Sequence, residues 1–192
     1  MRRCYWGLLS ALLAVLVSGC PDSNPPCTRE VYFPVAEGRS YRYVTFDNGY
    51  NVTGAEVIKF KSVEGNKVTL GGPSSLFGGS SEFEFTDDAI TIGPEGFQLL
   101  RFPFQDGDVW SGGPTWGGVT VTRNVAKVGL FQIYDYYDSW SGIRWKDYYD
   151  VFLITTQPTE LEGLPTRIWL APNRGVIAFY LHPDGIYYYK KY

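Results

Sequence analysis

The sequence predicts an all-β protein, an antiparallel meander that forms a closed or partly closed barrel or sandwich and has two similar β halves. Its 192 residues include 22 Gly and 12 Pro, and after residue 20 one or the other interrupts the chain every few residues. The apolar residues between these breaks are mainly Val, Ile, Tyr and Phe, which favour strands over helices. With 44% hydrophobic residues, the chain buries enough apolar surface to exclude disorder.

Turn residues set the boundaries of about a dozen short strands. Asn48-Gly49 is the preferred two-residue hairpin turn, Glu64-Gly65-Asn66 marks another hairpin, and Pro183-Asp184-Gly185 separates the last two strands. The predicted strands cover residues 41–46, 50–53, 55–63, 67–70, 83–86, 89–92, 119–128, 130–137, 144–156, 167–170, 176–181 and 186–189. The glycine-rich residues 71–81 are predicted to be a loop.

One segment occurs twice, 69 residues apart. Residues 33–41 (FPVAEGRSY) and residues 102–110 (FPFQDGDVW) share Phe, Pro and an acid before Gly, and each ends in a large aromatic residue. Pro ends strand pairing, acid-Gly forms a turn, and the aromatic side chain anchors the next strand in the core. We call these the two entry segments, and they are the basis for expecting two similar β halves.

The first twenty residues predict export. Arg2 and Arg3 precede an apolar run over residues 8–17, which is too short to span a membrane and is typical of a secretory signal. The run ends in Leu16-Val17-Ser18-Gly19-Cys20, which resembles the bacterial lipobox. This resemblance implies cleavage after Gly19 and a lipid anchor on Cys20. We therefore expect a signal peptide at 1–19, a lipidated cysteine with a flexible proline-rich tether at 20–30, and one β-rich domain at 31–192.

Charge and cysteine usage limit the partners. The chain has 17 Lys and Arg against 20 Asp and Glu, so removal of two signal arginines leaves a mature charge of −5. Without a basic cluster, nucleic-acid binding is disfavoured. Beyond the signal and Cys20, the remaining cysteine is Cys27, which lies in the tether and cannot form an intramolecular disulfide. It either pairs with another protein or has no role.

The entry segments and residues 169–176 (WLAPNRGV) resemble a broad group of uncharacterised bacterial envelope lipoproteins, which carry FPL-x2-G-x2-W and W-x-A-P-G-x-G segments. The chain departs from that pattern at Tyr41, where Trp is usual, and at Asn173, where Gly is usual. The resemblance implies a β-rich exported domain with no established activity and no catalytic residues.

The sequence shows no group of residues typical of a catalytic site. His182 is the single histidine, and the chain lacks the phosphate- and dinucleotide-binding glycine motifs, so no cofactor is expected. The most unusual stretch is residues 134–150, YDYYDSWSGIRWKDYYD, which we expect to form a hairpin. A two-residue turn would place Asp138 opposite Asp147 and Asp135 opposite Asp150, a pairing that calls for a bridging Ca²⁺. A three-residue turn at 141–143 would pair Asp138 with Lys146 without a metal, and this second register is favoured.

In either register, large aromatic residues fall on both faces of the hairpin. One face packs on the core, and the other meets solvent or a ligand, unless loops bury both. The candidate binding surface comprises Tyr134, Tyr136, Tyr137, Trp140, Trp145, Tyr148 and Tyr149.

The sequence thus favours a non-enzymatic, membrane-anchored lipoprotein of the bacterial cell envelope, exposed outside the cytoplasm. Its β domain would bind an envelope protein, a glycan or a hydrophobic ligand, or play a structural role. The alternatives are a membrane-tethered hydrolase that uses paired Asp residues and a lipid or hydrophobe carrier.

Overall fold

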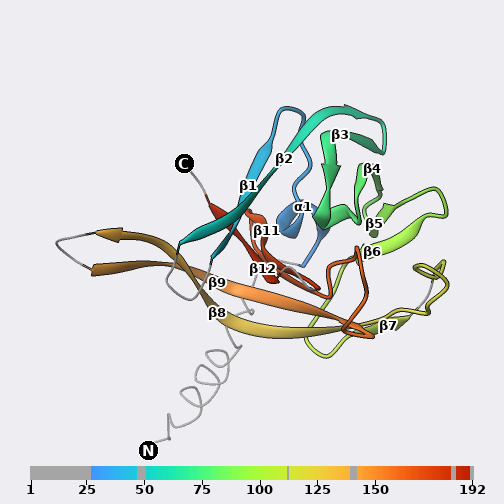
Figure 1. The fold of residues 1–192 in the computed structure, drawn as a ribbon. Coiled ribbons are helices and arrows are strands. Elements are labelled where there is room, and N and C mark those ends of the chain that lie inside the picture. The colour runs from blue at the N-terminus through green and yellow to red at the C-terminus, as the bar shows by residue number, and fades with distance from the viewer. Residues whose placement is uncertain (1–26, 47–50, 112, 139–141, 183–184, 191–192) are drawn as a thin grey trace, which may run out of the picture.

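The computed structural model describes residues 27–46, 51–111, 113–138, 142–182 and 185–190. It confirms the all-β prediction: twelve strands form one antiparallel sheet in the order β6-β5-β4-β3-β2-β1-β12-β11-β10-β9-β8-β7 (Figure 1). The strands are β1 (Ser40–Phe46), β2 (Val52–Glu64), β3 (Lys67–Ser74), β4 (Ser80–Phe85), β5 (Ala89–Ile92), β6 (Phe97–Arg101), β7 (Val109–Ser111), β8 (Thr122–Asp138), β9 (Gly142–Gln157), β10 (Arg167–Ala171), β11 (Gly175–Leu181) and β12 (Gly185–Lys190).

The sheet consists of two six-stranded meanders, β1 to β6 and β7 to β12. They join where β12 pairs with β1, at Tyr189 opposite Tyr43. β6 and β7 are the two ends of the sheet, and in the described residues no hydrogen-bonded ladder connects them. The sheet is therefore curved but not closed by hydrogen bonds.

The two entry segments have the same backbone hydrogen bonds. The Gly38 and Gly107 N–H groups donate to the carbonyls of Phe60 and Val125, at 2.8 and 3.0 Å. Phe60 and Val125 donate back to the residues after those glycines. Gly38 and Gly107 have φ angles of 76° and 85°, in the left-handed region that glycine adopts readily. The entry segments thus start β1 and β7 in equivalent ways, as the sequence predicts.

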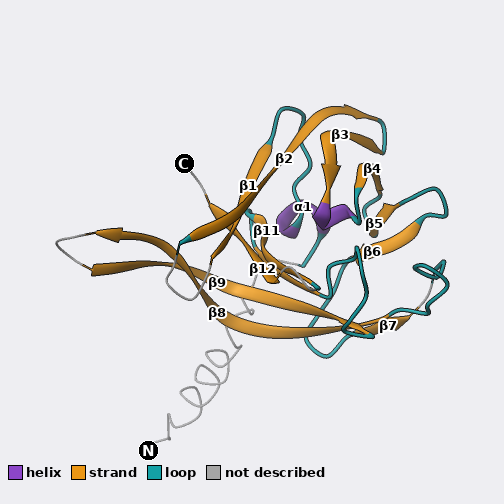
Figure 2. Cartoon of the chain, viewed as in Figure 1, coloured by secondary structure: helices purple, strands orange, loops and turns teal. Residues whose placement is uncertain are grey.

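Inside the curve of the sheet lie two short helices, α1 (Arg29–Tyr32) and the 3₁₀ helix η1 (Ser75–Phe77) (Figure 2). Tyr32 of α1 is part of the main core, and so are Leu76 and Phe77 of η1. The prediction of a loop at 71–81 is therefore wrong, because Leu76 and Phe77 are apolar enough to draw this glycine-rich segment into the core. Residues 27–30, predicted to belong to the tether, also contain part of the packed domain, since Cys27 contacts the main core.

Side chains fill the main core around Phe33 and Phe77. The void bounded by Phe33, Tyr43, Phe60 and Phe77 measures about 10 Å³, which is roughly the space of one water. This leaves no room for a lipid at that place, as the carrier alternative would need.

The longest strands, β8 and β9, form one hairpin that extends well beyond the rest of the molecule (Figure 1). Asp138 lies opposite Gly142, and Gln132 lies opposite Asp147. Both predicted registers are therefore wrong. The reason is that three shifts in register, at 127/129, 129/131 and 134/136, change which residues face each other.

A second core lies on the opposite face of the sheet from the main one. Ile168 and Leu170 of β10 point into the main core, whereas the alternate residue Trp169 points into the second. Phe131 of β8 stacks on Trp169 with ring centroids 5.2 Å apart. The base of the β8–β9 hairpin therefore packs against the outer side of the sheet.

Candidate functional site

The part of the hairpin around the Phe131–Tyr148 pair has one buried and one open face. Ile133 and Tyr148 belong to the second core. The neighbouring residues along each strand form what we call the open hairpin face, because alternate residues in a strand point to opposite sides. The open hairpin face consists of Gln132, Tyr134, Trp145, Asp147 and Tyr149.

Two large aromatic side chains on this face are accessible to a partner. Trp145 is 49% exposed and Tyr149 is 64% exposed. Both lie on β9, four residues apart, which corresponds to about 13 Å along an extended strand. Tyr134, directly opposite Trp145, contacts it edge-on at 6.2 Å. This arrangement presents rings at two points along β9.

Asp147 lies between these rings and is held by two neighbours. Its Oδ1 accepts a hydrogen bond from Gln132 Nε2 at 2.9 Å, and its Oδ2 accepts one from the Tyr149 hydroxyl at 3.3 Å. A carboxylate has further lone pairs, so Asp147 remains able to accept hydrogen bonds from a ligand. The open hairpin face thus combines apolar rings with a fixed polar group.

Of the aromatic residues that the sequence predicts as a binding surface, some are exposed in the structure and others are buried. Trp145 and Tyr149 are exposed, but Tyr148 is 5% exposed and does not belong to an accessible surface. Tyr134 is half-buried, and its ring meets that of Phe46 at 5.2 Å. Trp140 and the side chains of Tyr136 and Tyr137 lie outside the described residues.

The aspartates that the metal and hydrolase alternatives require are not paired as predicted. Asp147 faces Gln132, and Asp150 forms an ion pair with Lys127 at 3.4 Å. The side chains of Asp135 and Asp138 are outside the described part of the chain. Within that part, no three His, Cys, Asp or Glu side chains gather as ligands of a metal ion.

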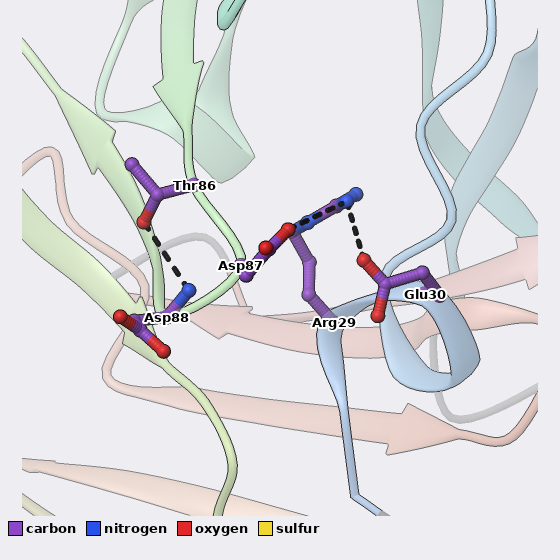
Figure 3. Close-up of polar contacts among 5 residues, drawn as sticks. All are labelled: Arg29, Glu30, Thr86, Asp87 and Asp88. Carbon is purple, nitrogen blue, oxygen red and sulfur yellow. Dashed lines mark hydrogen bonds and ion pairs between the residues drawn. The ribbon is translucent and has the colours of Figure 1, made fainter.

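A polar cluster attaches α1 to the turn between β4 and β5 (Figure 3). Arg29 is buried, and its Nη2 lies 2.6 Å from Glu30 Oε1 and 3.7 Å from Asp87 Oδ1. The guanidinium also lies over the Phe85 ring, 4.7 Å from its centroid. Asp88 N–H donates to Thr86 Oγ1 at 3.2 Å, which shapes the turn that receives the arginine. We interpret this cluster as structural, because the Arg29 guanidinium is held by two carboxylates and an aromatic ring of the same domain.

Cys27 lies just before this helix and is half-buried. Burial raises the pKa of its thiol, and a hydrogen bond with the Tyr32 side chain only partly offsets this effect. A thiol of this kind is mostly protonated and weakly nucleophilic at neutral pH. Gly19 and Cys20, the predicted cleavage and lipidation sites, lie outside the described residues. In the part that the structure describes, no helix has the length and apolar character needed to span a membrane.

Arg123 is a buried residue that the sequence analysis did not single out. It is 1% exposed, on β8, and donates from Nη1 to Thr156 Oγ1 at 3.0 Å. A signal for it does exist: Val121 and Val125 are two residues before and after Arg123, so strand alternation places all three on the same, apolar face.

Comparisons with protein-family models, with curated protein sequences and with solved structures find no match for this chain. The resemblance to envelope lipoproteins therefore stays a prediction, and no enzyme family is identified.

Proposed function

We propose that this protein is a non-enzymatic lipoprotein of the bacterial cell envelope, which binds an envelope glycan through the open hairpin face. The observation that carries the proposal is the exposure of Trp145 and Tyr149 on a projecting hairpin whose other face is buried. Exposed aromatic surface of this kind is typical of a binding site.

The chemistry of the face favours a glycan over an apolar ligand. Aromatic rings pack against the C–H faces of sugar rings, and their negative π faces attract the slightly positive C–H groups. Asp147 is placed to accept hydrogen bonds from sugar hydroxyls on a partner lying along β9. An open strand suits an extended chain, whereas a small apolar ligand needs a concave site.

The anchor follows from the lipobox at Leu16–Cys20. Cys20 and Cys27 are seven positions apart, with six residues between them, and Cys27 already packs on the main core. A fully extended chain of that length spans no more than about 25 Å. The β domain would therefore work close to the membrane surface, where several acyl chains hold a protein firmly.

Metabolic labelling with an alkyne-bearing fatty acid tests the anchor. The natural chain and a Cys27→Ser variant are expected to take up label and to sediment with membranes. A Cys20→Ser variant is expected to do neither. Equal labelling of all three chains would contradict lipidation at Cys20.

Co-sedimentation with purified peptidoglycan sacculi tests the binding. We expect Trp145→Ala, Tyr149→Ala and Asp147→Asn each to weaken binding by about tenfold, which corresponds to a loss of about 1.4 kcal/mol. Val57→Ala is the matched control, because Val57 is 65% exposed but lies on β2. Sedimentation that none of the three hairpin variants reduces, or no binding by the natural chain, would refute the glycan proposal.

A further inference from the structure

An open cavity of about 430 Å³ lies between the turn that joins β5 to β6 and the loop that joins β7 to β8. Both segments lie at the right of Figure 1, whereas the outer part of the β8–β9 hairpin extends to the left. The turn contributes Pro94 and Glu95, β6 contributes Phe97, and the loop contributes Thr115 and Trp116. The volume is within the range of small-molecule sites.

Two aromatic rings, those of Phe97 and Trp116, form walls of this cavity. They meet at an angle of 62°, with centroids 5.3 Å apart. Phe97 is buried, whereas Trp116 is only partly buried, so that its ring remains accessible to a ligand. Among the aromatic side chains, tryptophan is the one that attracts a cation most strongly.

Trp116 is held in place by its own loop and by two distant segments. Its backbone N–H and carbonyl pair with those of Val119, at 3.0 and 2.9 Å. Its Nε1 donates to the Glu162 carbonyl at 3.2 Å. A Cβ on Gly78 would overlap the Trp116 ring, so glycine leaves the space that the ring fills. The aromatic wall is therefore preformed, and a preformed site loses less conformational entropy when it binds a ligand.

The charge at the cavity is negative. Glu95 is the one charged residue among the described residues that line it. Its carboxylate is exposed and forms no ion pair with any cation in the described part of the chain. A carboxylate and a tryptophan ring both attract an ammonium group, whereas the carboxylate repels an acid. The lining of the cavity therefore favours a ligand that carries a positive charge.

A buried cation limits where that charge can lie. Arg123 is not among the described lining residues, but its guanidinium carbon lies 5.5 Å from the Phe97 ring centroid. Burial lowers the pKa of the guanidinium to about 9, so it stays charged at neutral pH, and its Nη2 has no hydrogen-bond partner among the described residues. A second cation against the Phe97 ring would be repelled by Arg123. The positive end of a ligand is therefore expected beside Trp116 and Glu95, with its apolar part against Phe97.

We propose that this cavity binds a small amine with an apolar body. The ammonium group lies over Trp116 and near the Glu95 carboxylate, and the apolar body lies against Phe97 and Pro94. All four side chains line the cavity in the structure as it stands, so binding requires no buried group to move. The site is independent of the open hairpin face, and its test does not depend on glycan binding.

Calorimetric titration of the full-length protein in phosphatidylcholine nanodiscs tests the proposal, with empty nanodiscs to subtract partitioning. The probes are 4-phenylbutylamine, 4-phenylbutan-1-ol and 4-phenylbutyrate, which share one carbon skeleton. We expect the amine to bind about three- to tenfold more tightly than the alcohol at low salt, because an exposed ion pair and a cation–π contact each contribute modestly. The acid is expected to bind most weakly. Equal binding of amine and alcohol, or tighter binding of the acid, would overturn the proposal.

Two variants locate the amine in the cavity. Glu95→Gln changes an exposed turn residue, so it is expected to fold, to weaken amine binding by about threefold and to leave alcohol binding unchanged. Glu37→Gln is the matched control, because Glu37 is also exposed but does not line the cavity. Trp116→Leu keeps apolar bulk without a π face and is expected to weaken the amine more than the alcohol. An amine preference that survives Glu95→Gln in full, or that Glu37→Gln reduces as much, would refute the proposal.

Discussion

Lys127 and Asp150 form an ion pair across the bend of the long hairpin, with Nζ and Oδ1 3.4 Å apart. At this bend each strand has a residue in the left-handed region, Gly129 with φ 79° and Asp150 with φ 52°. The Asp150 carbonyl also accepts a hydrogen bond from the hydroxyl of Tyr32 in α1, at 3.1 Å. The bend is thus fixed on both strands, and it sets which hairpin face packs on the sheet and which stays open.

Gly129→Ala is expected to destabilise the domain by about 1 to 2 kcal/mol, because an L side chain is strained at this φ. A Cβ at this position would meet no atom within 4 Å, so the cost is conformational and not steric. Urea unfolding measures it, with Gly72→Ala as control, since Gly72 has equal space and no positive φ. Equal stability of the two variants would contradict the assignment of Gly129 as the bend.

Two tryptophans near the hairpin are expected to behave in opposite ways. Trp169→Ala removes a ring from the second core and from the stack on Phe131, which should cost about 3 to 5 kcal/mol of unfolding free energy. Trp145→Ala, at a half-exposed position, should change it by less than about 1 kcal/mol. Thermal and urea unfolding of both variants test this, and a large loss at Trp145 would mean that the open hairpin face is packed.

The stability of the fold is expected to decline as the pH rises into the alkaline range. The pKa values of Cys27 and Tyr32 are both raised by burial, Cys27 from an ordinary value of 9.0. The folded state therefore keeps protons that the unfolded state releases, so this stability is complete below about pH 9 and is lost as pH rises through the folded pKa.

The rate of iodoacetamide labelling reports the ionisation of the Cys27 thiol directly, in a chain with Cys4 and Cys20 replaced by serine. The midpoint of its pH profile is expected to lie higher in the folded protein than in urea. A Cys27→Ala variant should lose part of the alkaline decline in stability and keep the part due to Tyr32. Identical labelling profiles in the two states would refute the raised pKa.

The cluster around α1 predicts unequal roles for Arg29 and its acidic partner. Asp87→Ala should cost no more than about 0.5 kcal/mol, because the Asp87 carboxylate is almost fully exposed. Arg29→Ala should cost about 1 to 2 kcal/mol, because it also loses the packing over Phe85. Unfolding in urea compares the two, and an Asp87→Ala variant as damaging as Arg29→Ala would show that the ion pair dominates.

Local chemistry explains which strands the sequence predicts well. The turn at Gly65 and Asn66 separates β2 from β3 as expected, with Gly65 at φ 58°. The two entry segments were also recognisable, because Pro, acid-Gly and the anchoring aromatic act within nine residues. The sequence does not predict the short edge strand β6, since Phe97–Arg101 lies between turns and has little alternation to mark it.

The β8–β9 hairpin has a feature that residues close along the chain do not determine, which is its register. Its existence follows from aromatic and β-branched content, but its register depends on bulges at Gly129 and Asp150, whose positions depend on packing against α1 and Trp169. A shift of one residue exchanges the faces of a strand. The sequence therefore could not separate the buried Tyr148 from the exposed Tyr149.

The sequence by itself determined the strand class, the turns and the repeated entry to each half, because each depends on residues that are close along the chain. Export and anchoring stay predictions from the first twenty residues. Only the tertiary structure decided the pairing of β12 with β1, the open seam between β6 and β7, and the unpaired burial of Arg123 beside Phe97. These features depend on contacts between distant segments, whose energies come from how whole strands pack, and no local pattern records them.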